Sequence, residues 1–150
     1  MRDVQRRKVY AAEQSIRHLS EPVGSFGAAV EYIAKTQAEP WFIAAFGNSA
    51  PLSVSQFFGT NKAFYTPGRD MITLPPEETA GMWAYSPLVL LHEIAHHVEI
   101  DDHGPRFAGA FLYMVQQTDT VDDITSFALQ LAFQQHGVRA ITPRIRSNAS

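Results

Sequence analysis

One short segment limits the folds open to this chain more than any other: His92-Glu93-Ile94-Ala95-His96, which has the pattern H-E-x-x-H. On an α-helix, residues i and i+4 lie on the same face, so His92 and His96 can both reach one metal ion. Glu93 lies about 100° around the helix from His92, where it can flank the ion without binding it. In a chain of this length and composition, chance produces the pattern only about 0.01 times. The segment therefore predicts a metal site on a helix.

The sequence around this motif is that of a capped and buried helix. Ser86-Pro87 supplies an N-cap and a first-turn proline, and the residues that follow are mostly apolar. The pattern predicts a helix over 86–100, a break at 101–104, and a second helix from Pro105 to about Gln117.

A catalytic zinc site needs a third protein ligand and an open position for water. His103 is the preferred third ligand, because Gly104 lets the chain turn sharply and bring the imidazole back towards the helix. Glu99, Asp101 and Asp102 are the rival ligands. The sequence thus predicts one Zn²⁺ in a three-histidine site, although Ni²⁺, Co²⁺ or Fe²⁺ can compete for such ligands.

Other polar residues are candidates for supporting roles. Asp101 and Asp102 can accept the second N–H of a ligand imidazole, or can simply be solvated at the helix end. His97 is expected at the surface or beside a ligand. Three side chains are candidates for stabilising an oxyanion, and no sequence feature chooses among them: Arg106, Tyr113 and Tyr85.

Composition narrows the class of protein. The chain of 150 residues has no cysteine and a formal net charge of −3, which fits one globular domain and makes a nucleic-acid partner unexpected. No apolar stretch follows the charged N-terminus, and none is long enough to span a membrane, so a cytoplasmic location is predicted. The oligomeric state is not indicated.

Helical periodicity marks both halves of the chain. A first helix is predicted over about 3–19 with Asp3 as its cap, and a second helix begins after Ser25. The segment 40–47 fits a short helix or a buried strand. A final helix starts near 119–120, ends at Gly137, and is followed by a loose tail over about 139–150. Its predicted inner face comprises Ile124, Phe127, Ala128, Leu131 and Ala132.

Three short strands are predicted between these helical segments, near 52–55, 63–65 and 71–74. Their short connections favour an antiparallel meander. The strand 71–74 precedes the metal-site helix, and its edge is expected to border the cleft and to bind an extended peptide by strand addition.

The residues of the two metal motifs resemble a known family. The run 91–97, Leu-His-Glu-Ile-Ala-His-His, followed by His-Gly-Pro-Arg-Phe at 103–107, resembles the zinc metallohydrolases of actinobacteria and their phages. It is more distantly similar to the SprT-like and WLM metallopeptidases, in which the second histidine motif supplies the third ligand. The segments 2–10 and 72–75 also look like the first group, so the resemblance covers most of residues 2–117. The spacing to the third histidine disfavours the metzincins.

This resemblance implies His92, His96 and His103 as ligands and Glu93 as catalytic base. The chain is therefore expected to be a single α+β domain of the minimal zincin type, with a small antiparallel or mixed sheet of about three strands packed on helices. Its expected activity is hydrolysis of a peptide or other amide bond by Glu93-assisted attack of zinc-bound water. The alternatives are a non-catalytic zinc-binding structural or interaction module, and a regulatory protease or toxin with one protein partner.

Overall fold

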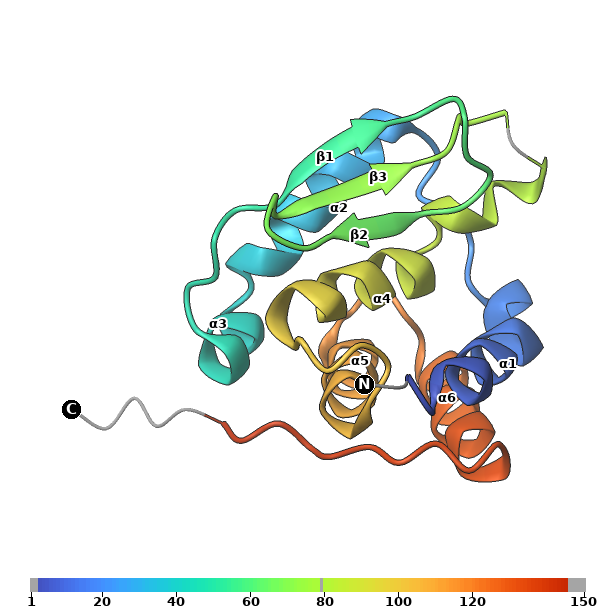
Figure 1. Cartoon of the computed structure of the whole chain (residues 1–150), viewed down its shortest axis with the longest axis vertical. Helices are drawn as coiled ribbons and strands as arrows, with labels where there is room; N and C mark the ends of the chain where they lie inside the picture. The colour runs from blue at the N-terminus through green and yellow to red at the C-terminus, as the bar shows by residue number, and fades with distance from the viewer. Residues whose placement is uncertain (1–2, 79, 146–150) are drawn as a thin grey trace.

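The computed structural model describes residues 3–78 and 80–145. It is α+β, as predicted, with a small sheet lying over a group of helices (Figure 1). In chain order the elements are α1 (Arg6–Ile16), the 3-10 helix η1 (Arg17–Leu19), α2 (Phe26–Ala38), α3 (Pro40–Phe46), β1 (Ser53–Gln56), β2 (Phe64–Thr66), β3 (Met71–Leu74), the 3-10 helix η2 (Ala80–Tyr85), α4 (Pro87–Val98), α5 (Pro105–Gln117) and α6 (Asp123–Gln135).

The sheet is mixed, with the strand order β1-β3-β2. β3 runs parallel to β1, with Ser53 opposite Met71, and antiparallel to β2, with Tyr65 opposite Ile72. The predicted antiparallel meander is therefore wrong. After β1, the segment 57–63 leads to β2, which lies at the opposite edge of the sheet. A tight hairpin turn then joins β2 to β3, which lies between the other two strands.

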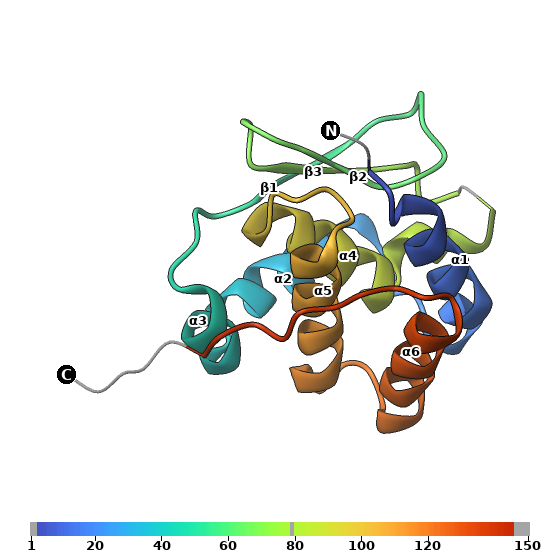
Figure 2. The same ribbon diagram turned by 60° about the horizontal axis from the view of Figure 1, so that its bottom comes forward.

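Helix α4 is the centre of the molecule. Helices α2 and α4 lie on one face of the sheet, and α5 packs against α4 on the side away from the strands (Figures 1 and 2). α1 packs against α6 beside them. Every residue of α4 from Pro87 to Ala95 is buried, as expected of a helix that is apolar nearly all round. None of the described helices combines the length and apolar character needed to cross a bilayer.

Helix boundaries differ from the sequence pattern mainly at the N-terminus. α1 begins at Arg6 with Gln5 at the N-cap and no capping side chain, so the predicted Asp3 cap is wrong. The ambiguous segment 40–47 is the helix α3, which starts at Pro40 and ends where Gly47 adopts a φ of 76°.

α6 presents a different face to the core from the one predicted. Its N-cap is Asp122, whose carboxylate accepts a hydrogen bond from the Thr125 N–H at 2.7 Å, so the helix starts later than residues 119–120. The residues that α6 buries are Thr125, Leu129, Ala132 and Phe133. Of the predicted inner residues, Ala132 is confirmed, whereas Ile124 and Phe127 are 77% and 59% exposed. The helix carries two apolar stripes with helical spacing, and α1 and α5 cover the stripe that was not predicted.

The segment after α6 is attached to the body of the protein. It runs across α5 in Figure 2. The Arg139 N–H donates to Gln5 Oε1 at 2.6 Å, and the Ile141 N–H donates to the Pro105 carbonyl at 2.9 Å. The sequence predicts a loose tail from Arg139, but residues 139–141 are thus fixed by the first helix and α5. Residues 146–150 of that tail lie outside the described part of the chain.

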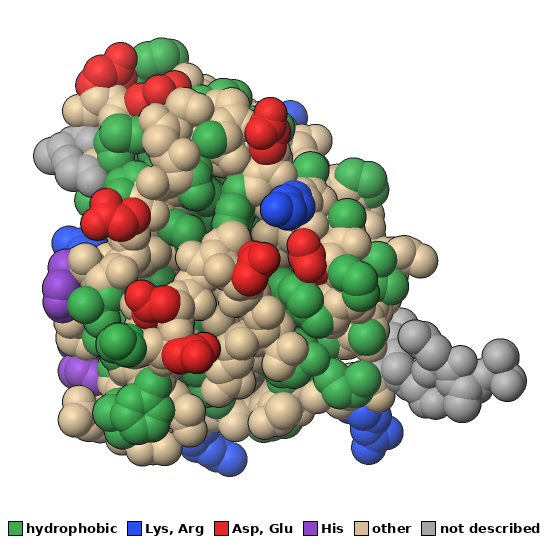
Figure 3. Space-filling view, turned by 180° about the vertical axis from the view of Figure 1, so that it is seen from behind, with side chains coloured by type: hydrophobic (Ala, Val, Ile, Leu, Met, Phe, Trp, Pro, Cys, Tyr) green, Lys and Arg blue, Asp and Glu red, His purple; other side chains and the backbone are tan. Residues whose placement is uncertain are grey.

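Charge is dispersed on the face turned away from the viewer in Figure 1. Figure 3 shows carboxylates spread over that face among polar and apolar side chains, and among the described residues no patch of Lys and Arg gathers there. This distribution agrees with the net charge of −3.

Candidate metal centre

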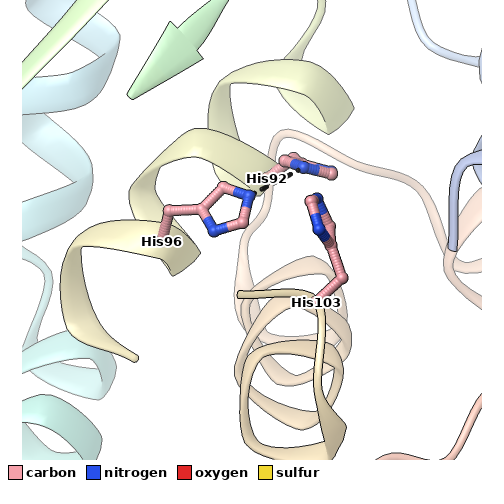
Figure 4. A group of neighbouring side chains, drawn as sticks. All are labelled: His92, His96 and His103. Carbon is pink, nitrogen blue, oxygen red and sulfur yellow. Dashed lines mark hydrogen bonds between the residues drawn. The ribbon is translucent and has the colours of Figure 1, made fainter. Parts of the chain in front are cut away.

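His92 and His96 lie one turn apart on α4 and face the same side (Figure 4). The helix begins as predicted, with Pro87 in its first turn and Ser86 Oγ accepting a hydrogen bond from the Val89 N–H at 3.4 Å. The Nε2 atoms of the two histidines are 3.2 Å apart. The spacing of the motif therefore places two imidazole nitrogens at one point on the helix surface.

His103 reaches the same point from the turn between α4 and α5. Asp102 has a φ of 55° and the Gly104 N–H donates to the Asp101 carbonyl at 2.8 Å, which folds the chain back after α4. One ring nitrogen of each histidine lies within 4.8 Å of the other two, so the group could hold a metal ion. His103 Nε2 is buried and has no hydrogen-bond partner. A buried nitrogen without a partner fits an atom that awaits a ligand.

Carboxylates from the N-terminal segment hold the outer nitrogens of two of these rings. Glu13 Oε2 lies 2.6 Å from His92 Nδ1, and Asp3 Oδ2 lies 2.6 Å from His103 Nδ1. A carboxylate that accepts the Nδ1–H leaves Nε2 as the unprotonated nitrogen. With both carboxylates ionised, as a bound cation would favour, each ring presents an unprotonated Nε2 for a metal.

The sequence predicts Asp101 or Asp102 in this supporting role, and the structure places neither there. The Asp101 carboxylate accepts hydrogen bonds from the Arg106 and Phe107 N–H groups, each at 2.9 Å, and so caps α5, while Asp102 is exposed. The carboxylates that do contact the rings lie 79 and 100 residues away along the chain from their histidines. Local spacing carries no signal for such distant pairs.

Burial sets the charge state of His92 and His96. Burial, with a smaller effect from His103, lowers the pKa of His92 well below its usual value. Burial, followed by the neighbouring His92 and His103, lowers the pKa of His96 to about 2. Both imidazoles are therefore neutral near pH 7, which is the form that binds a cation. The donor set, the neutral His92 and His96 imidazoles and the unpartnered His103 nitrogen all fit a divalent metal such as zinc.

Glu93 follows His92 on α4 and is 6% exposed. Burial, followed by the nearby Glu13, raises the pKa of its carboxyl group well above the usual value. Glu93 belongs to the walls of two cavities, which also share Tyr10 and Ala63. An ionisable group with a raised pKa that lines two cavities is placed to exchange a proton with a ligand there.

Tyr10 is a site residue that the sequence did not single out. Its ring stacks on His92 with centroids 5.5 Å apart, and lies 5.0 Å from the ring of His103. Burial and the carboxylates of Glu93 and Glu13 raise the pKa of its hydroxyl to about 12. The hydroxyl therefore remains a donor at neutral pH. Tyr10 and Glu13 are three residues apart on α1, a spacing that puts both on one helix face.

The three predicted oxyanion helpers lie elsewhere. The Tyr85 hydroxyl donates to the Pro75 carbonyl at 2.6 Å and accepts from Gln56 Nε2 at 2.9 Å, so it is used within the core. Tyr113 packs edge-on against two aromatic rings of α3. Arg106 is exposed at the start of α5. None of the three lines either cavity beside the histidines.

His97 has a structural role outside the cluster. Its Nδ1 lies 3.1 Å from the Tyr65 hydroxyl, and its Nε2 lies 2.8 Å from the Ala50 carbonyl oxygen. These contacts join α4 to β2 and to the segment before β1.

The strand beside the site is β2, not β3. β3 is the middle strand, and its Ile72 and Leu74 are fully buried. β2 is an edge strand that contacts α4, and Phe64 and Tyr65 line one of the two cavities. The predicted border at 71–74 is therefore wrong, because the mixed topology puts the intervening hairpin strand at the edge.

In comparisons with known proteins, no family model matches this chain, and no curated protein or solved structure matches it. The resemblance in the two metal motifs therefore stays a prediction from the sequence.

Proposed function

We propose that this chain is a zinc-dependent hydrolase that cleaves peptide or other amide bonds. The observation that carries the proposal is the convergence of three histidines, one with an unpartnered buried Nε2, beside a buried glutamate that borders two cavities. Zinc favours such ligands, and when bound there it supplies a Lewis acid that polarises water and carbonyl groups and favours ionised Glu93.

Glu93 is proposed as the group that takes a proton from the attacking water and delivers it to the leaving amine. Its burial supports this role, because burial raises the pKa of the carboxyl group and makes its ionised form a stronger proton acceptor. Tyr10 supplies a hydroxyl that stays protonated and can donate to a developing oxyanion. Glu13 and Asp3 hold the ligand rings in place.

A closed structural zinc site is the rival interpretation. Such a site uses four protein ligands, whereas a catalytic site uses three and keeps one position open. Among the described residues, the group with metal-ligand geometry contains three histidines and no fourth side chain. The ligand count therefore favours catalysis.

Metal analysis of purified protein tests the ligand set. Wild type is expected to bind one zinc per chain, and His103→Ala is expected to lose most of its affinity. His136→Ala is the matched control, because His136 is exposed at the end of α6 and does not belong to the three-histidine group. Full zinc affinity in His103→Ala would overturn the ligand assignment.

Hydrolysis of a quenched fluorescent peptide pool tests the reaction. Glu93→Gln is expected to keep its zinc and to lose roughly 10²- to 10⁴-fold in rate, the usual contribution of a general acid–base group. Undiminished hydrolysis by Glu93→Gln, or no hydrolysis of any peptide by zinc-loaded wild type, would contradict the proposal.

A further inference from the structure

The two cavities beside Glu93 form the two arms of one cleft. One has a volume of about 420 Å³ and the other of about 520 Å³. Tyr10, Ala63 and Glu93 belong to the walls of both, so the arms meet at the proposed proton-transfer group. A ligand that fills both arms must therefore pass Glu93.

The first arm, which we call the basic arm, is walled by apolar side chains and bordered by cations. Its cations are Arg6, Arg17 and Lys62, and its apolar wall includes Trp83 and Leu88. Its carboxyl groups are Glu13 and the shared Glu93, and burial raises the pKa of both. The Arg17 guanidinium lies 4.8 Å from the centre of the Trp83 ring, which fixes this charge against the wall.

The second arm, which we call the acidic arm, has the opposite charge. Its lining includes Asp70, Glu99 and Asp102, and contains no Lys or Arg among the described residues. Asp70 and Asp102 both have positive φ values, at the hairpin turn and at the turn that carries His103, so two fixed turns present these carboxylates.

Neither set of charges is paired with Lys or Arg at ion-pair distance within the described residues. Across the described parts of the chain, no Lys or Arg nitrogen lies within 4.0 Å of a carboxylate; the ion pairs all involve histidines. Of the three acidic-arm carboxylates, Asp70 alone takes part in such a pair, with His97 at 3.5 Å. Charges of opposite sign at the two ends of a cleft attract complementary groups and repel a ligand bound in the opposite direction.

We propose that this cleft binds an extended peptide in a single direction, with an acidic group in the basic arm and a Lys or Arg side chain in the acidic arm. The edge strand β2 begins directly after Ala63, and its Phe64 and Tyr65 line the acidic arm, which gives the peptide backbone a strand to pair with. The inference rests on the proposed function, since it names the substrate class of the same site.

Peptide binding to zinc-loaded Glu93→Gln tests the proposal without turnover. Three fluorescent decapeptides are compared by anisotropy: Glu-Glu at the N-terminus with Lys-Lys at the C-terminus, the same ends exchanged, and a neutral version, all with the same apolar centre. One charged order is expected to bind at least about tenfold more tightly than the other two. The preference should weaken as salt is added, because exposed charges are screened. Equal affinities for both charged orders, or no binding, would overturn the proposal.

Charge exchange in the protein locates the effect. Arg17→Glu with Lys62→Glu, and separately Asp70→Lys with Glu99→Lys, should each reduce the affinity of the preferred peptide about tenfold or more. All four changes together should favour the exchanged peptide. Lys35→Glu on α2, outside both arms, is the control and should change neither. The milder Arg17→Gln with Lys62→Gln gives the same test should the reversed charges disturb folding.

The outcomes separate this inference from the proposed function. Ordered binding by Glu93→Gln without any cleavage by wild type would support the polarity of the cleft and contradict hydrolysis. Cleavage of both charged orders at equal rates would support hydrolysis and overturn the polarity.

Discussion

At the scale of single residues, the candidate metal centre includes a buried carboxyl group, that of Glu13, whose burial opposes its ionisation. Glu13 is 8% exposed, and its burial, opposed by His103 and Arg17, raises its pKa to about 8. Burying an ionisable group lowers stability unless it is paired, and Glu13 has its contact with His92 as compensation. Such a local conflict is typical of functional sites.

Glu13→Gln should therefore weaken metal binding without weakening the fold. The amide keeps the shape of the carboxyl group but cannot ionise when a cation binds, and so cannot make the His92 imidazole a better ligand; zinc affinity should therefore fall about 10- to 100-fold. Chelator competition measures the affinity and urea denaturation of the metal-free protein measures stability. Glu31→Gln on the exposed side of α2 is the control. Unchanged zinc affinity would show that the Glu13 contact does not support the site.

The residues of the centre differ in how far the sequence could reveal them. His92, Glu93 and His96 share one helical turn, so their spacing alone predicts their common position. His103 follows the helix closely enough for a turn to bring it back. Tyr10 and the carboxylates on the N-terminal segment meet the histidines only through tertiary packing, and one sequence has no local pattern that joins such distant positions.

At the scale of elements, the turn between α4 and α5 both ends one helix and starts the next. Asp101→Ala removes the acceptor for two N–H groups of α5, so we expect a loss of about 1–2 kcal/mol in the free energy of unfolding, together with weaker zinc binding through a looser His103. Urea denaturation and chelator competition measure the two effects. Asp102→Asn is the control and should change neither stability nor zinc affinity, because residue 102 is exposed and asparagine tolerates its positive φ. Equal stability of the Asp101 variant and this control would argue against the cap.

A second element-scale prediction concerns the close approach of the C-terminal segment to α5. A Cβ at Gly109 would collide with the backbone of Ile141. Gly109→Ala should therefore lower stability by about 1–3 kcal/mol, despite the better helix propensity of alanine. Gly27→Ala on α2 is the matched control, because its nearest neighbour is Ser25 Oγ at 3.9 Å. Thermal unfolding of both variants measures the effect. A Gly109→Ala variant as stable as wild type would mean that the C-terminal segment does not pack against α5 at Gly109.

Element positions were predictable where one local signal dominated, and not where two were equivalent. Ser86-Pro87 predicts one feature only, the start of a helix, and the start of α4 confirms it. α6 offers two apolar stripes, and only packing against α1 and α5 decides which is buried. Strand order has no local signature at all, because β2 and β3 are joined by the same tight turn in either arrangement.

At the scale of the whole molecule, folding assembles the centre from three separate regions of chain. α1 with its preceding residues, α4, and the turn before α5 meet at the histidines, and Gln5 links the first region to the other end of the chain. Its side-chain amide donates to the carbonyls of His103 and Arg139 at 3.0 and 3.1 Å. The metal centre and the global fold should therefore respond together to changes that titrate the buried groups.

The pH dependence of stability tests this coupling in the metal-free protein. Glu13 keeps its proton to about pH 8 when folded but loses it near 4.5 when unfolded, so its contribution is lost as the pH rises towards 8; Glu93 acts in the same direction. His96 has a folded pKa of about 2 against 6.5 unfolded, so its contribution is lost as the pH falls below 6.5, and His92 acts likewise. Between pH 4.5 and 6.5, a rise in pH therefore lowers the free energy of unfolding through the two glutamates and raises it through the two histidines.

Stability without metal should therefore be nearly level from pH 4.5 to 6.5 and fall on both sides. Each titrating group contributes up to about 1.4 kcal/mol per pH unit, so Glu13 alone should remove about 2 kcal/mol between pH 6.5 and 8. Urea denaturation in the presence of a chelator measures the profile. Glu13→Gln should flatten the alkaline side, because amides do not titrate, whereas Glu31→Gln should leave it unchanged. Stability that rises from pH 6.5 to 8 in the metal-free wild type would mean that these carboxyl groups are not protonated inside the fold, and that the buried centre is held together by ion pairs instead.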